Sequence, residues 1–336
     1  MIEIDGSEKG GSGTILRQSI ALAAVLGEEI HICNVRVKRE NPGLRPQHLE
    51  AVRTAARLTD ADLKGAEIGS RDVWFSPGST KDGKFESEIG SAGSIPLLFM
   101  TIIPLCLNSE VELRVRNGGT DTRGAPTINY MKNVFLRALE VMGAKISIEI
   151  EKYGYYPRGG GEAVLRTEPS KLRPLYLGEI KKSSVIEGIS VSTFLEDKRV
   201  SERQAAAARD MLGGYSSRIG VRYDYSNPMQ KGSSIALWGR GGFLGSDAIG
   251  EPKKSSERVG NEAAGKLSRE LDSGATVDVH LADMLVPYLA LSGGNSKFFV
   301  REISEHLETS IHLAQRIMGI EFKVKRSNGI FSIEKL

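Results

Sequence analysis

Residues 15–37 read ILRQSIALAAVLGEEIHICNVRV, and this stretch decides the predicted fold. Its first part, Ile15–Leu26, has apolar residues at helical spacing and stops at Gly27, the residue type that most often ends a helix. Its second part, Ile30–Val37, alternates apolar and polar residues as a half-buried strand does. The stretch therefore predicts an amphipathic helix, a stop and a strand.

The same succession of helix, stop and strand recurs along the chain. The further predicted pairs are Leu97–Leu107 with Val111–Val115, Asn129–Met142 with Lys145–Ile150, and Thr309–Met318 with Ile320–Val324, with stops at Asn108, Gly143 and Gly319. Strands with one polar face suit a sheet that helices cover on one side only. We therefore predict an α/β (α+β) main domain built from repeated helix-plus-strand units.

The sequence pattern changes near residues 181–184, and the segment after them is predicted to form its own strands and helices. These are predicted strands at Val185–Phe194 and Ser217–Tyr225 and predicted helices at Glu202–Leu212 and Ser255–Leu271. We predict that residues 183–276 form an inserted smaller α/β domain. Residues 1–182 and 277–336 would then form the main catalytic domain.

The bulk composition narrows the classes of function. The chain has 336 residues and a net charge of only +3, so nucleic acid would bind at one focal site rather than along a broad basic face. Cys33 and Cys106 lack metal-ligand spacing and suit a reducing compartment. The apolar run Ile95–Leu107 is too short to span a bilayer and the N-terminus lacks a signal peptide pattern, so we expect a cytoplasmic protein without membrane contact. Apolar residues on the helices fit a core as well as a subunit interface.

A short cationic loop, RENPGLRPQH at residues 39–48, contains two prolines and a glycine, and Arg36 and Lys38 precede it. Proline restricts the backbone, so the loop would present its side chains from a nearly preset shape. Arginine grips phosphate with paired hydrogen bonds, and a helix N-terminus favours anions. The loop therefore predicts a phosphate-binding site at a helix start.

The chain has five histidines. His31 fits a structural strand position and His312 a helix surface, whereas His48, His280 and His306 stand at the ends of predicted elements. His280 is expected just before the apolar helix Leu285–Leu291. A neutral imidazole can attack a phosphate ester when cations lie nearby. No zinc site, P-loop or dinucleotide fingerprint occurs in the sequence.

Several motifs together resemble the RNA 3'-terminal phosphate cyclase family. They lie at residues 4–6, 13–17, 41–49, 65–70, 89–94, 118–121, 155–161 and 281–283, in order along nearly the whole chain. The resemblance implies the repeated fold that this family shares with enolpyruvyl transferases. It also implies a ligase that uses ATP and a divalent cation, Mg²⁺ or Mn²⁺. In that reaction a histidine is adenylated, AMP passes to an RNA 3'-phosphate, and the 2'-hydroxyl closes a 2',3'-cyclic phosphate.

The resemblance also implies roles for individual residues. His306 matches the catalytic nucleophile. The ATP-binding positions are Met100, Pro126, His280, Leu281, Ala282, Asp283 and Met284, with Asp283 holding the nucleotide and Pro126 beside the adenine. The contacts to phosphate and the RNA end are Arg17, Arg39, Gln47 and His48.

The sequence departs from the family pattern at three positions. Gly10 stands where the family usually has an acidic residue, Met100 where it has Gln, and Ser310 where it has Asn. Glu8 is close enough in sequence to replace the missing acid, so the metal ligands stay unassigned. Two other functions remain open: a non-catalytic RNA-binding relative acting in ribosome assembly, which would lack the histidine, and an enolpyruvyl-type transferase on a related scaffold.

Overall fold

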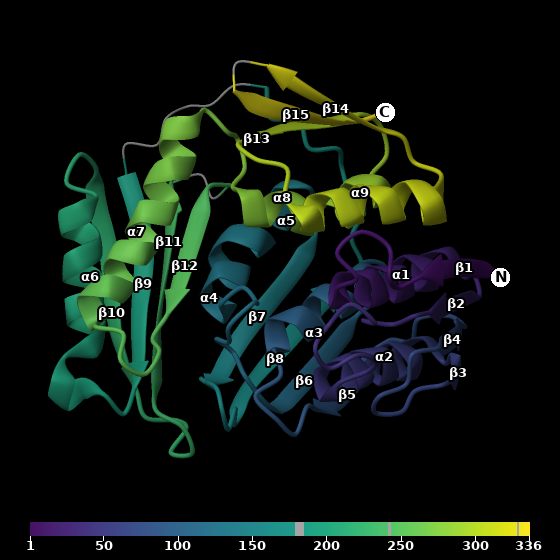
Figure 1. Cartoon of the computed structure of the whole chain (residues 1–336), viewed down its shortest axis with the longest axis horizontal. Coiled ribbons are helices and arrows are strands. Elements are labelled where there is room, and N and C mark those ends of the chain that lie inside the picture. The colour runs from purple at the N-terminus through teal and green to yellow at the C-terminus, as the bar shows by residue number, and fades with distance from the viewer. Residues whose placement is uncertain (179–184, 241–242, 328) are drawn as a thin grey trace.

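The computed structural model describes residues 1–178, 185–240, 243–327 and 329–336, and Figure 1 shows their arrangement. In this part of the chain the strands form four separate sheets. Three of the sheets surround a shared layer of helices, and the fourth lies to one side with two helices of its own.

The first unit contains six elements in the order β-α-β-α-β-β. They are β1 (Ile2–Asp5), α1 (Gly13–Leu26), β2 (Ile30–Cys33), α2 (Pro46–Thr59), β3 (Asp62–Lys64) and β4 (Val73–Ser76). The sheet order is β1-β2-β4-β3, with β1 and β2 parallel and the other pairs antiparallel.

The second unit repeats this order with longer strands. Its elements are β5 (Gly83–Glu88), α3 (Ile95–Ile102), the 3₁₀ turn η1 (Ile103–Cys106), β6 (Val111–Gly118), α4 (Ile128–Tyr130), the π-helical turn η2 (Met131–Phe135), α5 (Leu136–Val141), β7 (Lys145–Lys152) and β8 (Gly161–Glu168). The order β5-β6-β8-β7, with only β5 and β6 parallel, matches that of the first unit.

The third unit is formed by α8 (Val279–Leu291), β13 (Ser296–Val300), α9 (Glu305–Met318), β14 (Phe322–Ser327) and β15 (Ile330–Lys335). Its order is β13-β15-β14, and Tyr176 makes a parallel bridge to Lys297 in the position of the missing first strand. The predicted internal repetition is therefore confirmed.

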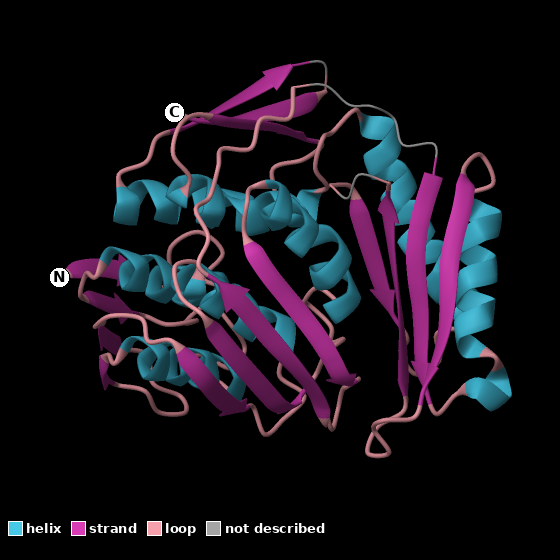
Figure 2. Cartoon of the chain, turned by 180° about the vertical axis from the view of Figure 1, so that it is seen from behind, coloured by secondary structure: helices cyan, strands magenta, loops and turns pink. Residues whose placement is uncertain are grey.

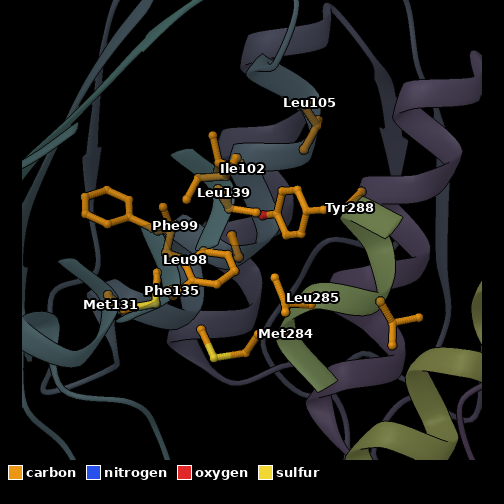
Figure 3. Packing of buried hydrophobic residues seen from close by; sticks show 14 of the residues in the cluster. Leu98, Phe99, Ile102, Leu105, Met131, Phe135, Leu139, Met284, Leu285 and Tyr288 are labelled. Carbon is orange, nitrogen blue, oxygen red and sulfur yellow. The ribbon is translucent and has the colours of Figure 1, made fainter. Parts of the chain in front are cut away.

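Helices cover one face of the long sheet, as the alternating pattern predicts, and Figure 2 shows its strands from the other side. The open face carries ion pairs instead of apolar side chains. Glu162 lies 2.9 Å from Arg114 and 3.0 Å from Lys152, and Arg166 lies 2.9 Å from Glu112. The apolar faces meet in the central helical layer, where side chains of α3, η2 and α8 interlock (Figure 3).

The inserted smaller domain consists of β9 (Val185–Thr193), η3 (Glu196–Lys198), α6 (Val200–Met211), β10 (Ser216–Asp224), β11 (Gly232–Gly239), β12 (Gly245–Ile249) and α7 (Ser256–Ser273). The sheet order is β10-β9-β11-β12, and the domain has its own apolar cluster. The change of sequence pattern expected at residues 181–184 lies outside the described residues. We propose the boundaries 183–276 because the separate cluster falls between them.

Several predicted elements differ in extent. The strand expected at Ile30–Val37 ends at Cys33, because Asn34 and Arg36 have positive φ angles of 51° and 54°. The helix expected at Leu285–Leu291 begins at Val279, so His280 lies inside it rather than before it. None of the described helices is long and apolar enough to cross a membrane.

Candidate functional site

The N-terminal ends of α1 and α9 lie side by side, and the two helices run in parallel (Figure 1). Thr14 Oγ1 lies 3.3 Å from His306 Nδ1, and one turn further Gln18 Nε2 donates to Ser310 Oγ at 2.7 Å. Four residues separate the two contacts on each helix, which fixes the parallel register. Parallel helices present two sets of free N–H groups at one place, and such an end attracts anions.

His306 stands in the first turn of α9, directly after Glu305, and its side chain is exposed. Ser304 caps this helix by accepting a hydrogen bond from the Leu307 N–H at 3.0 Å. Partial desolvation and the nearby Arg17 guanidinium lower the pKa of His306 below its ordinary value. The ring is therefore neutral near pH 7 and has a lone pair available for attack.

Arg17 lies one turn into α1, and its Nη2 donates to Thr14 Oγ1 at 3.4 Å. Burial lowers the pKa of Arg17 to about 10, and the charge of Asp283 opposes this shift. The guanidinium therefore stays charged at neutral pH. It lies close to His306, because both side chains contact Thr14 Oγ1. This threonine was not singled out for a role, although it belongs to one of the motifs quoted above.

The start of α8 brings a third helix end to the site. Asp278 caps it by accepting from the Leu281 N–H at 2.9 Å, and it also accepts from the Tyr130 hydroxyl at 2.7 Å and the Gly245 N–H at 2.9 Å. One buried carboxylate thus links α4 and α8 of the main domain to the inserted domain. His280 lies exposed in the first turn that Asp278 caps.

The segment from His280 to Met284 divides into two groups. Leu281, Ala282 and Met284 are buried in the core, and Figure 3 shows Met284 among the core side chains. Asp283 lies on the side of Arg17, where burial, followed by the charge of Asp278, raises its pKa to about 8. Asp283 is therefore mostly protonated at neutral pH and able to donate a hydrogen bond.

The cationic loop is held in one shape by its own backbone contacts. Arg36 Nη1 donates to the carbonyls of Asn41 at 2.9 Å and Gly43 at 2.8 Å, and the Gly43 N–H donates to Val35 O at 2.9 Å. Pro46 then begins α2. These contacts support the expected rigidity of the loop, and Arg36 contributes two of them.

The arginines at this end of the molecule make no direct ion pairs with acids among the described residues. Within the described residues, Arg17, Arg36, Arg39 and Arg45 form no ion pair with a carboxylate. Arg39 Nη2 reaches the Gly10 carbonyl at 3.4 Å, which places it across the entrance to α1. Uncompensated arginines at helix N-termini form a site for a polyanion.

His48 is nearly fully buried, at 4% exposure, and its Nδ1 has no hydrogen-bond partner in the structure. Burial, followed by the charges of Arg17, Arg36 and Arg45, lowers its pKa to about 3. A histidine in this state is neutral. While it is neutral, His48 can contact a phosphate only through a hydrogen bond and not as an ion pair.

Gln47 lies at the end of the cationic loop, in the first turn of α2. It also lines a cleft of about 1180 Å³ between the main and inserted domains. Its Oε1 accepts from the Ser94 N–H at 2.9 Å, which ties the glycine-rich loop at residues 90–94 to α2. The cleft is lined by exposed Arg123, Lys198, Lys231 and Tyr156, among others. Sequence reasoning missed this cleft, because its residues come from both domains.

The remaining predicted positions are Pro126, Met100 and Glu8. Pro126 is half-buried and precedes Thr127, whose N–H donates to Asp247 Oδ2 at 2.7 Å. Met100 is half-buried and packs against the main core. The expected acid substitute Glu8 is paired with His312, with 2.6 Å between Oε2 and Nε2.

The three helix N-termini, the unpaired arginines and the neutral histidine together are the features expected of a protein class that binds a polyanion next to a nucleophile. The chain belongs to the RNA 3'-terminal phosphate cyclase family, because the model of that family matches residues 8–324. This result confirms the family and the kind of enzyme that the motifs indicated.

Curated relatives agree along their full length. The chain is 44% identical to the RNA 3'-terminal phosphate cyclase of Pyrobaculum neutrophilum, with 99% of this chain and 97% of the relative covered. It is 40% identical to the protein of the same name from Methanosarcina mazei, covering 99% of each. The protein of that name from Methanothermobacter thermautotrophicus is 41% identical, with 98% of each covered.

Proposed function

We propose that this protein uses ATP to convert an RNA 3'-terminal phosphate into a 2',3'-cyclic phosphodiester, with His306 as the nucleophile. The observation that carries the proposal is the neutral, exposed imidazole of His306 beside Arg17 at a helix N-terminus. Membership of the cyclase family supports the same reaction.

We propose that the contact with Thr14 selects the reactive nitrogen. When His306 Nδ1–H donates to Thr14 Oγ1, the lone pair lies on Nε2, which is then free to attack phosphorus. The threonine oxygen also accepts from Arg17. The ring would thus be held in orientation by the same group that holds the nearest cation.

The proposed reaction has three displacements at phosphorus. His306 Nε2 attacks the α-phosphorus of ATP, and the bond to pyrophosphate breaks. An oxygen of the RNA 3'-phosphate then attacks the same phosphorus and releases the histidine. Finally the 2'-hydroxyl oxygen attacks the RNA phosphate, AMP departs with the bonding electrons, and the hydroxyl proton passes to solvent or a nearby base.

The residues around His306 fit the charge changes of these steps. The second step brings one phosphate group to another, and all three steps move negative charge between phosphate oxygens, which fixed guanidinium groups stabilise. Arg17 and Arg39 would contact the phosphates. Asp283 in its protonated form would hydrogen-bond the nucleotide, with His280 and Pro126 on its other sides. Met100 would supply an apolar contact only.

A divalent cation, Mg²⁺ or Mn²⁺, would neutralise charge on the phosphates when bound. The described residues contain no group of three or more His, Cys, Asp or Glu side chains that could hold a metal ion. Mg²⁺ commonly uses one or two carboxylates together with substrate phosphates, so the absence of such a group is compatible with this role.

We propose the interdomain cleft as the place of the RNA strand that leads to the reactive end. Gln47 lines this cleft and belongs to the same helix end as His48. Lys198 and Lys231 offer positive charge to the backbone, and Tyr156, 75% exposed, offers a face on which a base can stack.

The proposal is tested with an RNA oligonucleotide whose 3'-phosphate is radiolabelled. Incubation with the protein, ATP and Mg²⁺ should make the label resistant to phosphatase, and His306→Ala should abolish the protection. RNA binding with no such conversion by the wild-type protein would favour a non-catalytic RNA-binding relative. Stabilisation by phosphoenolpyruvate and not by ATP would instead favour an enolpyruvyl transferase.

A further inference from the structure

The loop between β1 and α1 lacks a side chain at Gly10, and a neighbouring acid fills the space. A Cβ at Gly10 would lie 2.5 Å from Glu305 Cδ and 2.7 and 2.8 Å from its two carboxylate oxygens. Gly10 does not have a positive φ, unlike Gly11 at 52°. Its backbone could therefore carry a side chain, and what the glycine provides is room for the Glu305 carboxylate.

Among the described acids near the entrance to α1, only Glu305 lies over the Gly10 backbone. Glu8 pairs with His312, and Asp283 is mostly protonated at neutral pH. Glu305 is exposed and forms no ion pair with a described residue, although Arg39 reaches the carbonyl of Gly10 just beside it. An acid in the first turn of a helix is favourable in itself. That effect does not explain why the carboxylate lies over the glycine loop.

A bare carboxylate at this position is a problem for the proposed substrate. Glu305 directly precedes His306, so in the proposed reaction its carboxylate would lie near the phosphates of the bound nucleotide. Two anions this close repel each other unless a cation lies between them. Mg²⁺ and Mn²⁺ prefer oxygen ligands and commonly bind one carboxylate together with substrate phosphates.

We propose that Glu305 is the protein ligand of a divalent cation that binds together with the phosphates of ATP, and that it occupies the place of an acid absent at position 10. This inference rests on the proposed function only in requiring that ATP binds at this site. It does not require that the protein converts ATP or RNA. The site is contributed by α9, and the loop before α1 only makes space for it.

The test measures Mn²⁺ binding by electron paramagnetic resonance in the His306→Ala background, where no adenylation can occur. ATP is present, and the signal of free Mn²⁺ reports the dissociation constant. Adding Glu305→Gln should raise the Mn²⁺ dissociation constant by at least about tenfold, since even outer-shell partners of a metal are worth 10–100-fold. The control is Glu308→Gln, an exposed acid in the same helical turn that should leave the constant unchanged.

A charge swap provides the decisive comparison. Gly10→Glu combined with Glu305→Ala moves the carboxylate from α9 to the loop, and we expect it to recover most of the Mn²⁺ affinity that Glu305→Ala alone loses. Unchanged affinity in Glu305→Gln, or an equal loss in Glu308→Gln, would overturn the assignment. Failure of the wild-type protein to cyclise RNA would count against the proposed function while this binding comparison still stands.

Discussion

Acidification should destabilise this protein through His48, a group that the proposed reaction does not require to be charged. The side chain is 4% exposed, and burial together with three neighbouring arginines lowers its pKa to about 3. In the unfolded chain the pKa returns to about 6.5. Between these two values the unfolded state binds a proton that the folded state does not, so the free energy of unfolding falls as the pH falls.

The size of the effect follows from the two pKa values. One pH unit within the window corresponds to about 1.4 kcal/mol, so the contribution of His48 lowers stability by about 2 kcal/mol between pH 7 and pH 5. Urea unfolding at several pH values, for wild type and His48→Gln, isolates this term by difference. Parallel stability profiles for the two proteins would refute the reasoning. So would an NMR spectrum that shows a protonated His48 ring at pH 5.

Three further outcomes are expected. The rate of adenylation at His306, measured by rapid quench, should fall with decreasing pH through an apparent pKa below 6.5. The reason is that protonation of the ring blocks attack and that burial lowers the pKa of His306. A midpoint above 6.5 would contradict this. Gly43→Ala should lower stability by about 3 kcal/mol in urea titrations, because φ is 74° and the new methyl group would overlap a backbone carbonyl, whereas Gly214→Ala meets nothing within 4 Å and should cost far less. Lys198→Glu with Lys231→Glu should weaken RNA binding, measured by fluorescence anisotropy, and leave adenylation intact; unaltered RNA affinity would exclude the cleft.

The repeated architecture could be predicted because its signals are local. Gly27 and Gly319 end α1 and α9 with φ angles of 69° and 68°, as expected of glycine after a helix. The alternation in β7 likewise matches a sheet with one face open to solvent. Each of these features depends on a few consecutive residues.

Features that depend on packing between distant segments were missed. The strand β11 begins Gly232-Ser-Ser, a poor strand sequence, and it forms because β9 and β12 pair with both of its edges. The start of α8 was placed too late because its first residues are not periodic. Asp278 sets that start through contacts with Tyr130 and Gly245, which lie far away in the sequence.

In the candidate site, too, local features could be predicted and features that depend on packing could not. The charges of the loop at residues 39–48 and the histidine at a helix start are visible in the sequence, and the resemblance supplied their roles. The burial of His48 and the position of Glu305 over Gly10 are not visible, because both depend on how α1, α2 and α9 meet. A missing side chain in one loop is interpretable only once the neighbour that fills its space is known.

The account depends most on whether His306 itself becomes bonded to AMP. The protein would be incubated with ATP and Mg²⁺ without RNA, digested at neutral pH, and its peptides analysed by mass spectrometry with fragmentation mild enough to keep the phosphoramidate bond. We expect the mass of one adenylyl group on His306, lost after brief treatment with acid or on addition of RNA bearing a 3'-phosphate. An adenylyl group on another residue, or an unmodified His306 in a protein that still cyclises RNA, would contradict the central claim.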